Sequence, residues 1–209
     1  MCMFKSFVAT KNMLYAYVGI ESHEEIIDIA GLGHLDKRHY VRLVRMELIP
    51  HEYTIDGFRN VDKWIFSIDQ DRIPDWFVTE EWEKRCRAWM KKNIHEDIEV
   101  VHSQLEVVLG NVDIMYGTGA ISLLFGNVNT MLHNSSIARI VGHGRVETMF
   151  SKSKIGIMQK ESSIGAMFVC SSVTVMNDNT WIEEMYDNTH VFSQYDNSKI
   201  LRDNRRSVR

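Results

Sequence analysis

Carboxylate side chains are dense between Asp69 and Glu83, where six acidic residues accompany a single base, Arg72. Paired carboxylates can bind Mg²⁺ or act as acid and base in hydrolysis. The segment DQDRIPD has no glycine to form the sharp turn of a calcium-binding loop. We expect either a solvated loop that leads into a helix or an acidic surface that competes for a basic, nucleic-acid-binding partner. The acidic residues are Asp69, Asp71, Asp75, Glu80, Glu81 and Glu83.

Aromatic residues lie within and beside this acidic stretch. Trp76, Phe77 and Trp82 are inside it, and Trp64 and Phe66 precede it. Some of these rings must pack in a core, but large aromatic side chains exposed on a loop are typical anchors of protein interfaces. The predicted partner-binding residues are Asp69, Asp71, Asp75, Trp76, Phe77, Glu80, Glu81 and Glu83.

Two further segments carry residues that could do chemistry. His95, Glu99 and His102 could meet on one face of a helix and bind a metal, but the segment leads into strands, and on a strand His102 faces away from the other two. The motif GLGH, residues 31–34, lacks the third glycine and the preceding strand of a dinucleotide-binding fingerprint. We expect a solvated junction at residues 95–102 and a helix end followed by a turn at residues 31–34.

Catalytic motifs are missing from the sequence. It contains no Gly-x-Ser-x-Gly, Walker loop, HExxH or cysteine–histidine constellation. Its three cysteines, Cys2, Cys86 and Cys170, are isolated, so we expect free thiols in a reducing cytoplasm. The sequence therefore predicts no catalytic residue, no metal and no cofactor, and a protein that is not an enzyme.

Charge is distributed unevenly along the chain. Residues 1–102 contain 14 Lys+Arg and 18 Asp+Glu, whereas residues 103–209 contain 10 of each, which gives the net charge of −4. This balance argues against bulk phosphate binding, although the basic tail at residues 202–209 could touch phosphate. Neither a signal peptide nor an apolar run long enough to cross a membrane is recognisable, so we expect a cytoplasmic protein that does not bind membranes.

A nine-residue repeat dominates the second half of the chain. A β-branched residue recurs every nine residues, with an apolar residue, mostly Met, three positions later and a small residue two positions earlier. The β-branched positions are Val128, Ile137, Val146, Ile155, Ile164, Val173, Ile182, Val191 and Ile200. The following apolar positions are Met131, Ile140, Met149, Met158, Met167, Met176 and Met185, after which Gln194 and Asp203 break the pattern.

A short fixed period is typical of a solenoid, in which each unit buries its apolar face by stacking on its neighbours. Nine residues suffice for one short strand and one tight turn, and the Asp-Asn segments before the small residues suit the turns. An amphipathic helix array also fits the Ile and Met spacing, but turn-forming residues every nine positions would break each helix. Either two or three units could complete one coil.

Other solenoid functions fit the repeats less well. The turns MNDNT, YDNTH and YDNSK lack the glycines of a calcium-binding β-roll. The repeats carry single Ser or Thr positions and not the paired threonines of an ice-binding face. Outward positions such as Arg139, Glu147, Gly156, Thr174 and Glu183 are chemically mixed, so a carbohydrate-active enzyme with carboxylates along one face, such as Glu147 and Glu183, ranks last.

Units such as DNTHVFSQY and DNSKI resemble the short tandem repeats of β-solenoid proteins encoded by phages, prophages and bacteria. The segment VDKWIFSIDQDRIPDWF, residues 61–77, is similar to the leaders of such arrays. The resemblance covers about half of the chain. It implies a solenoid fold and an origin in a mobile element, and it transfers no catalytic residues.

The first hundred residues show no such period and read as α/β. We expect strands at residues 13–19, 39–49 and 63–69, a short helix at residues 22–31 with Ser22 as its N-cap, and a longer helix at residues 79–94 with Thr79 as its N-cap. The longer helix has an apolar stripe formed by Trp82, Cys86, Trp89 and Met90. We expect this region to cover the open first coil of the solenoid, since an exposed sheet edge must be protected.

The predicted fold is therefore mainly β. An α/β capping domain spans residues 1–102, a β-solenoid of nonapeptide repeats spans residues 103–201, and a basic tail spans residues 202–209. The predicted function is non-enzymatic binding of a host protein complex, as an inhibitor of host defence encoded by a phage or another mobile element. The alternative is a virion or assembly component, and one solenoid end could pair with a second copy to form a homodimer.

Overall fold

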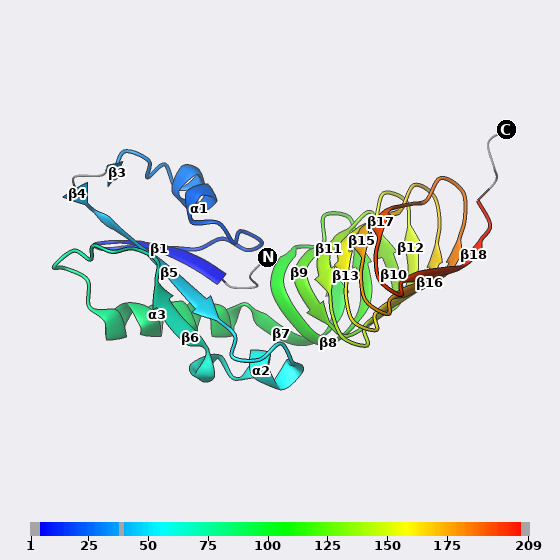
Figure 1. Ribbon diagram of the computed structural model, residues 1–209, viewed down its shortest axis with the longest axis horizontal. Coiled ribbons are helices and arrows are strands. Elements are labelled where there is room, and N and C mark those ends of the chain that lie inside the picture. Colours follow the sequence, from blue (N-terminus) through cyan, green and yellow to red (C-terminus); the bar gives the residue numbers. More distant parts are fainter. Residues whose placement is uncertain (1–4, 38–39, 206–209) are drawn as a thin grey trace. The chain divides into compact units, whose positions relative to one another are not determined.

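The computed structural model describes residues 5–37 and 40–205 (Figure 1). The chain divides into two compact units, Met1–Asn93 and Ile94–Arg209. The division lies earlier than the boundary expected after residue 102, because the strand β7 (Ile94–Val101) pairs with β8 (Gln104–Tyr116) and so belongs to the second unit.

The first unit is built on a four-stranded antiparallel sheet with the order β2-β1-β5-β6. The strands are β1 (Lys5–Thr10), β2 (Leu14–Tyr15), β5 (Leu43–Ile49) and β6 (Ile65–Ile68). The other elements are α1 (His23–Ile29), a separate pair formed by β3 (Asp36–Lys37) and β4 (Tyr40–Val41), α2 (Ile55–Arg59), a 3-10 turn η1 (Val61–Lys63) and α3 (Thr79–Lys92). The strand expected at residues 13–19 is thus only two residues long.

The helices α1 and α3 pack on opposite faces of this sheet (Figure 1). Neighbouring residues of a strand point to opposite faces. Accordingly, Val8 packs with Ile26 and Ile27 of α1, whereas the ring of Phe7 lies 5.6 Å from that of Trp89 in α3. The apolar stripe of α3 is therefore occupied within its own unit, and coverage of the solenoid by this unit stays a prediction.

The predicted helix caps hold for one helix only. The Ser22 side chain accepts a hydrogen bond from the backbone N–H of Glu25, as expected for the N-cap of α1. Thr79 is not the cap of α3. It is already the first helical residue, and the N-cap is the extended Val78, which has no side-chain acceptor.

The second unit is a parallel β-solenoid of about six turns over residues 98–203. Each strand from β11 onward pairs with the strand two places earlier, so two strands complete one turn. Two sheets face each other, and β8 bends between them, pairing with β9 through its first half and with β10 through its second. After β8 the strands are β9 (Ala120–Phe125), β10 (Val128–His133), β11 (Ser136–Ile140), β12 (Arg145–Phe150), β13 (Lys154–Met158), β14 (Ser163–Met167), β15 (Ser172–Met176), β16 (Trp181–Met185), β17 (His190–Gln194) and β18 (Lys199–Asp203).

Both apolar columns of the repeat lie inside the solenoid, except that the predicted Met131 is only half-buried and Leu132 takes its place, level with Met149. In neighbouring turns Val146 is level with Ile164 and Met149 is level with Met167, 18 residues apart. The β-branched residues from Val128 to Ile182 and the methionines from Met149 to Met185 are fully buried. The strand-and-turn interpretation is confirmed, the helix array is wrong, and the coil contains two nonapeptides.

The corners follow the predicted turn chemistry in part. Asp178, Asp187 and Asp196 adopt left-handed backbone with φ of 57°, 51° and 54°, which acidic and amide side chains tolerate better than other residues do. Val169 occupies the equivalent corner with φ 44°, where a β-branched residue is strained. Directly before alternate corners, the rings of Phe150, Phe168 and Tyr186 stack at 5.0 and 4.8 Å, close to the usual spacing of strands.

Candidate functional site

The predicted acidic stretch spans the end of β6, the following loop and the first turns of α3. Asp69, Asp71, Asp75, Glu80 and Glu81 are exposed, and Glu83 is half-buried. Glu81 pairs with Arg85 at 2.6 Å. Glu83 pairs with Arg87 at 2.5 Å, and Arg87 also donates to the carbonyls of Val61 and Trp64. Through Arg87, Glu83 therefore helps to attach α3 to the 3-10 turn of its own unit.

The aromatic residues of the stretch are mostly packed. Phe77 is buried and stacks on Trp82 with a centroid distance of 6.1 Å. Of the two alternatives for this ring, core packing holds and an exposed interface anchor does not, because Phe77 covers the buried Trp82 at the start of α3. Trp76 is half-buried and meets Trp82 edge-on at 5.9 Å.

Exposed apolar side chains lie between the acids instead. Ile73 is 48% exposed and Val78 is 51% exposed. Within the part of the chain that the structure describes, no ion pair engages Asp71, Asp75 or Glu80. We call these five residues, Asp71, Ile73, Asp75, Val78 and Glu80, the acidic-apolar surface.

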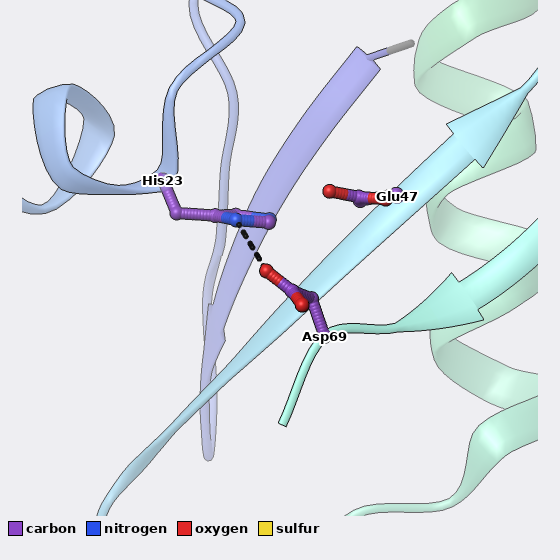
Figure 2. A group of neighbouring side chains, drawn as sticks. All are labelled: His23, Glu47 and Asp69. Atoms are coloured by element: carbon purple, nitrogen blue, oxygen red, sulfur yellow. Dashed lines mark ion pairs between the residues drawn. The ribbon is translucent and has the colours of Figure 1, made fainter. Parts of the chain in front are cut away.

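Asp69 belongs to a different group, together with His23 and Glu47 (Figure 2). One ligand atom from each of the three side chains lies within 4.8 Å of the others. His23 Nδ1 lies 3.4 Å from Asp69 Oδ2, and His23 Nε2 lies 3.0 Å from the backbone oxygen of Met46. His23 is 5% exposed, Glu47 is half-buried, and Asp69 is exposed to solvent.

The register of the sheet accounts for this grouping. Glu47 on β5 is level with Ser67 on β6, so Asp69 is its diagonal neighbour on the same face. Glu47 is also level with Ser6 on β1, whose hydroxyl donates to the Glu21 carbonyl at 2.5 Å. That bond ties the segment leading into α1 to the sheet and brings His23 over Glu47. Burial raises the pKa of the Glu47 carboxyl. The charge of His23 lowers this pKa in part, and the charge of Asp69 raises it further.

Sequence reasoning included Asp69 only as part of the acidic stretch and did not single out His23 or Glu47. Across the described ranges, residues 5–37 and 40–205, this is the only group of three metal-ligating side chains within reach of one ion. His95, Glu99 and His102 accordingly form no such group there, and His102 stacks on Tyr116 at 6.2 Å. The GLGH segment is a helix end, as expected, with Gly31 at φ +66° after α1.

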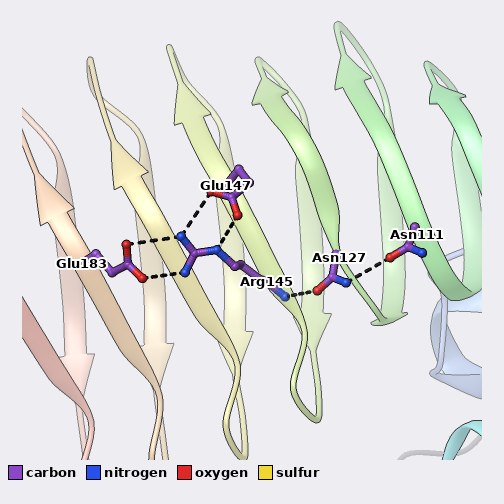
Figure 3. Close-up of polar contacts among 5 residues, drawn as sticks. All are labelled: Asn111, Asn127, Arg145, Glu147 and Glu183. Atoms are coloured by element: carbon purple, nitrogen blue, oxygen red, sulfur yellow. Dashed lines mark hydrogen bonds and ion pairs between the residues drawn. The ribbon is translucent and has the colours of Figure 1, made fainter.

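The outer face of the solenoid carries one extended polar network (Figure 3). Arg145 on β12 donates to Glu147 at 2.5 Å and to Glu183 at 2.6 Å. The intervening strand β14 has Gly165 at this level, where an added Cβ would lie 2.9 Å from Arg145 Nη2. The Arg145 backbone N–H donates to Asn127, which in turn donates to Asn111. The two carboxylates that a hydrolase would need therefore share one arginine.

The last turn of the solenoid ends in polar groups. Gln194 takes the place level with Met176, and Asp203 takes that level with Met185. Gln194 donates to the Ser198 carbonyl at 2.5 Å, and Arg205 bonds Asp203 at 2.7 Å. The basic tail expected over residues 202–209 begins later, because β18 continues through Asp203 and Arg202 pairs with Glu184. Arg206 and Arg209 lie outside the described residues.

Comparison of the chain with protein-family models, with curated proteins and with solved structures found no match. In the described residues no helix has the length and apolar character needed to cross a membrane. The resemblance to repeats of mobile elements, the homodimer and the binding partner stay predictions.

Proposed function

We propose that this chain is a non-enzymatic binding protein, which acts in the cytoplasm of a host cell and engages a host protein complex through the acidic-apolar surface. The observation that supports the proposal is the set of three carboxylates, Asp71, Asp75 and Glu80, which have no ion pair among the described residues and alternate along the chain with exposed Ile73 and Val78. The resemblance of the repeats to those of phages and prophages suggests a defence complex as the target.

The chemistry of this surface fits a partner with basic and apolar groups. Exposed charges steer association and select partners, while apolar side chains at the centre of an interface supply most of the affinity. Ile73 and Val78 alternate with the carboxylates along the chain, so a lysine- or arginine-rich surface can meet both kinds of group at once. A protein that normally holds nucleic acid presents such a surface, and bound carboxylates would compete with phosphate.

The packing beneath the surface favours binding without rearrangement. Phe77 stacks on the buried Trp82, and Arg87 fastens α3 to the 3-10 turn through the Val61 carbonyl. At the other end of the loop the Gln70 side chain accepts from the backbone N–H of Arg45 and donates to the Arg72 carbonyl. A loop held at both ends loses less conformational entropy when it binds.

Hydrolysis of a carbohydrate fits the polar network poorly. A glycosidase needs one carboxyl with a raised pKa as general acid. Hydrogen bonds from Arg145 instead lower the pKa of Glu183, and the same guanidinium holds Glu147. This arrangement favours a structural role for both carboxylates.

The test is a pull-down of tagged protein from host lysate at physiological and high salt, with bound proteins and nucleic acids identified. A variant with Asp71→Lys, Asp75→Lys and Glu80→Lys is expected to lose a defined protein complex that the wild type recovers. The matched control reverses three exposed acids elsewhere, Asp28, Glu52 and Glu99, and is expected to retain the complex. Equal recovery by both variants would exclude this surface, and recovery of the chain alone in larger assemblies would favour a structural protein.

A further inference from the structure

We infer that His23, Glu47 and Asp69 form a binding site for one divalent transition-metal ion, with Zn²⁺ as the best-fitting cation. The inference rests on the geometry of the α/β unit alone and does not depend on the proposed function. Its three donors are one imidazole nitrogen and two carboxylates, which come from α1, β5 and the residue directly after β6.

The hydrogen bond of the His23 ring determines which nitrogen faces the carboxylates. A backbone carbonyl only accepts hydrogen bonds, so Nε2, at 3.0 Å from the Met46 oxygen, must carry a proton. In the neutral ring Nδ1 is then a bare lone pair, and it faces Asp69 Oδ2. Two acceptors that face each other at this distance repel, so a proton or a metal cation must lie between them.

The distance between these two atoms favours the metal. A direct charged N–H···O bond spans roughly 2.7–2.9 Å, whereas His23 Nδ1 and Asp69 Oδ2 are 3.4 Å apart. Two ligands that each bind a tetrahedral zinc ion at about 2.1 Å are separated by about 3.4 Å. The pair is therefore spaced like two ligands of one ion.

The surroundings of the ring match those of metal-bound histidines. Such a histidine almost always donates its other N–H to a carbonyl or carboxylate, which sets the ring orientation and makes the ligand more basic. The Met46 carbonyl, held in the central strand β5, fills this role for His23. Arg45 lies two residues before Glu47 on the same face of β5. Its positive charge contributes to the lowered pKa of the nearby Glu24 carboxyl.

The donor set also selects among metals. Imidazole nitrogen suits zinc and its transition-metal neighbours, whereas Mg²⁺ and Ca²⁺ prefer oxygen donors throughout. The burial gradient from His23 through Glu47 to the exposed Asp69 leaves solvent access on the Asp69 side. Three protein ligands with an open side leave room for water as a further ligand.

The test is calorimetric titration of the metal-free full chain with Zn²⁺, followed by elemental analysis after dialysis. Asp69→Asn removes one anionic ligand at an exposed position, and we expect it to weaken the binding of one zinc equivalent at least about tenfold. The matched control is Asp71→Asn, an exposed carboxylate two residues away, which is expected to bind like the wild type. Mg²⁺ at the same concentration is expected to leave both proteins unchanged.

A second measurement needs no variant. Nitrogen NMR of the histidine rings is expected to show Nε2 of His23 protonated throughout and the Nδ1 resonance shifting when Zn²⁺ is added. Zinc binding of equal strength in wild type and Asp69→Asn, or an Nδ1 resonance that does not respond to Zn²⁺, would overturn the inference. A proton on Nδ1, in a simple ion pair between His23 and Asp69, would then be the correct description.

Discussion

The guanidinium of Arg145 reaches the carboxylate of Glu183 at 2.6 Å, although a whole strand, β14, lies between β12 and β16. The contact is possible because β14 presents Gly165 at that level, without a side chain to stand in the way. This ion pair thus spans three consecutive strands of one sheet, which belong to three successive turns of the solenoid.

This ion pair makes the stability of the solenoid depend on pH. Hydrogen bonds from Arg145 lower the pKa of Glu183 below the 4.5 of a free glutamate. The stabilisation is therefore fully present above the unfolded pKa and is lost as the pH falls through the folded pKa. Because Glu183 is 42% exposed, we expect Glu183→Gln to cost only about 0.2–1 kcal/mol at neutral pH and nothing in strong acid. Urea unfolding at several pH values checks this, with the exposed Glu99→Gln as control; a cost that does not change with pH would contradict it.

The strained corner at Val169 offers a stabilising substitution. Its φ of 44° matches those of Asp178, Asp187 and Asp196 at equivalent corners, and left-handed backbone costs an ordinary residue about 1–2 kcal/mol. We expect Val169→Asp to raise the free energy of unfolding by about 1 kcal/mol, because aspartate tolerates this conformation and the site is 49% exposed. Val169→Thr keeps the β-branch and should give no gain. Equal stabilities for the two variants would argue against strain at this corner.

The polar end of the solenoid should limit self-association. Gln194 and Asp203 stand where the interior of every earlier complete turn carries an apolar residue. Replacing both by Met would continue the apolar column to the exposed end, and we expect oligomers that grow with concentration in light scattering. For the wild type we expect one size at all concentrations. If the oligomers of the wild type also grow with concentration, the result would favour the alternative function, an assembly component whose solenoid ends stack.

The two described cysteines should differ sharply in reactivity. Burial raises the pKa of the Cys86 thiol to about 12, so this thiol stays protonated and inaccessible near neutral pH, whereas Cys170 is exposed. In a Cys2→Ser background we expect a thiol reagent to label one cysteine of the native chain and two after denaturation. Rapid labelling of Cys86 in the native protein would mean that α3 opens readily.

The repeat predicted the solenoid because its evidence is local. Every nine residues the chain gives the same apolar, small and turn-forming positions, and burial of these columns follows directly. The number of repeats per turn could not be obtained from the columns. Every nonapeptide has the same apolar positions, so the sequence does not show whether Val146 and Ile155 lie in the same sheet or in opposite sheets. The 18-residue spacing of Phe150, Phe168 and Tyr186 is the signal that distinguishes two repeats per turn from three.

The candidate sites were harder to predict for a physical reason. His23, Glu47 and Asp69 form no motif, because their meeting depends on the register between β5 and β6 and on the bond from Ser6 that positions α1. Likewise, nothing in the sequence separates Phe77, which is buried, from the exposed Val78 beside it. Both outcomes depend on contacts between segments that are distant in sequence.

Successive strands of the solenoid alternate between two sheets. This alternation determines how many residues can be deleted or duplicated in evolution without disturbing the fold. Deleting nine residues would keep the apolar columns continuous, yet every later strand would move to the opposite sheet, separating pairs such as Arg145 and Glu183. Deleting or duplicating 18 residues preserves both the interior and the outer faces, because residues 18 apart are level in neighbouring turns. Lineages of this protein should therefore differ in length by whole turns, each change lengthening or shortening the solenoid while its surface pattern stays in register.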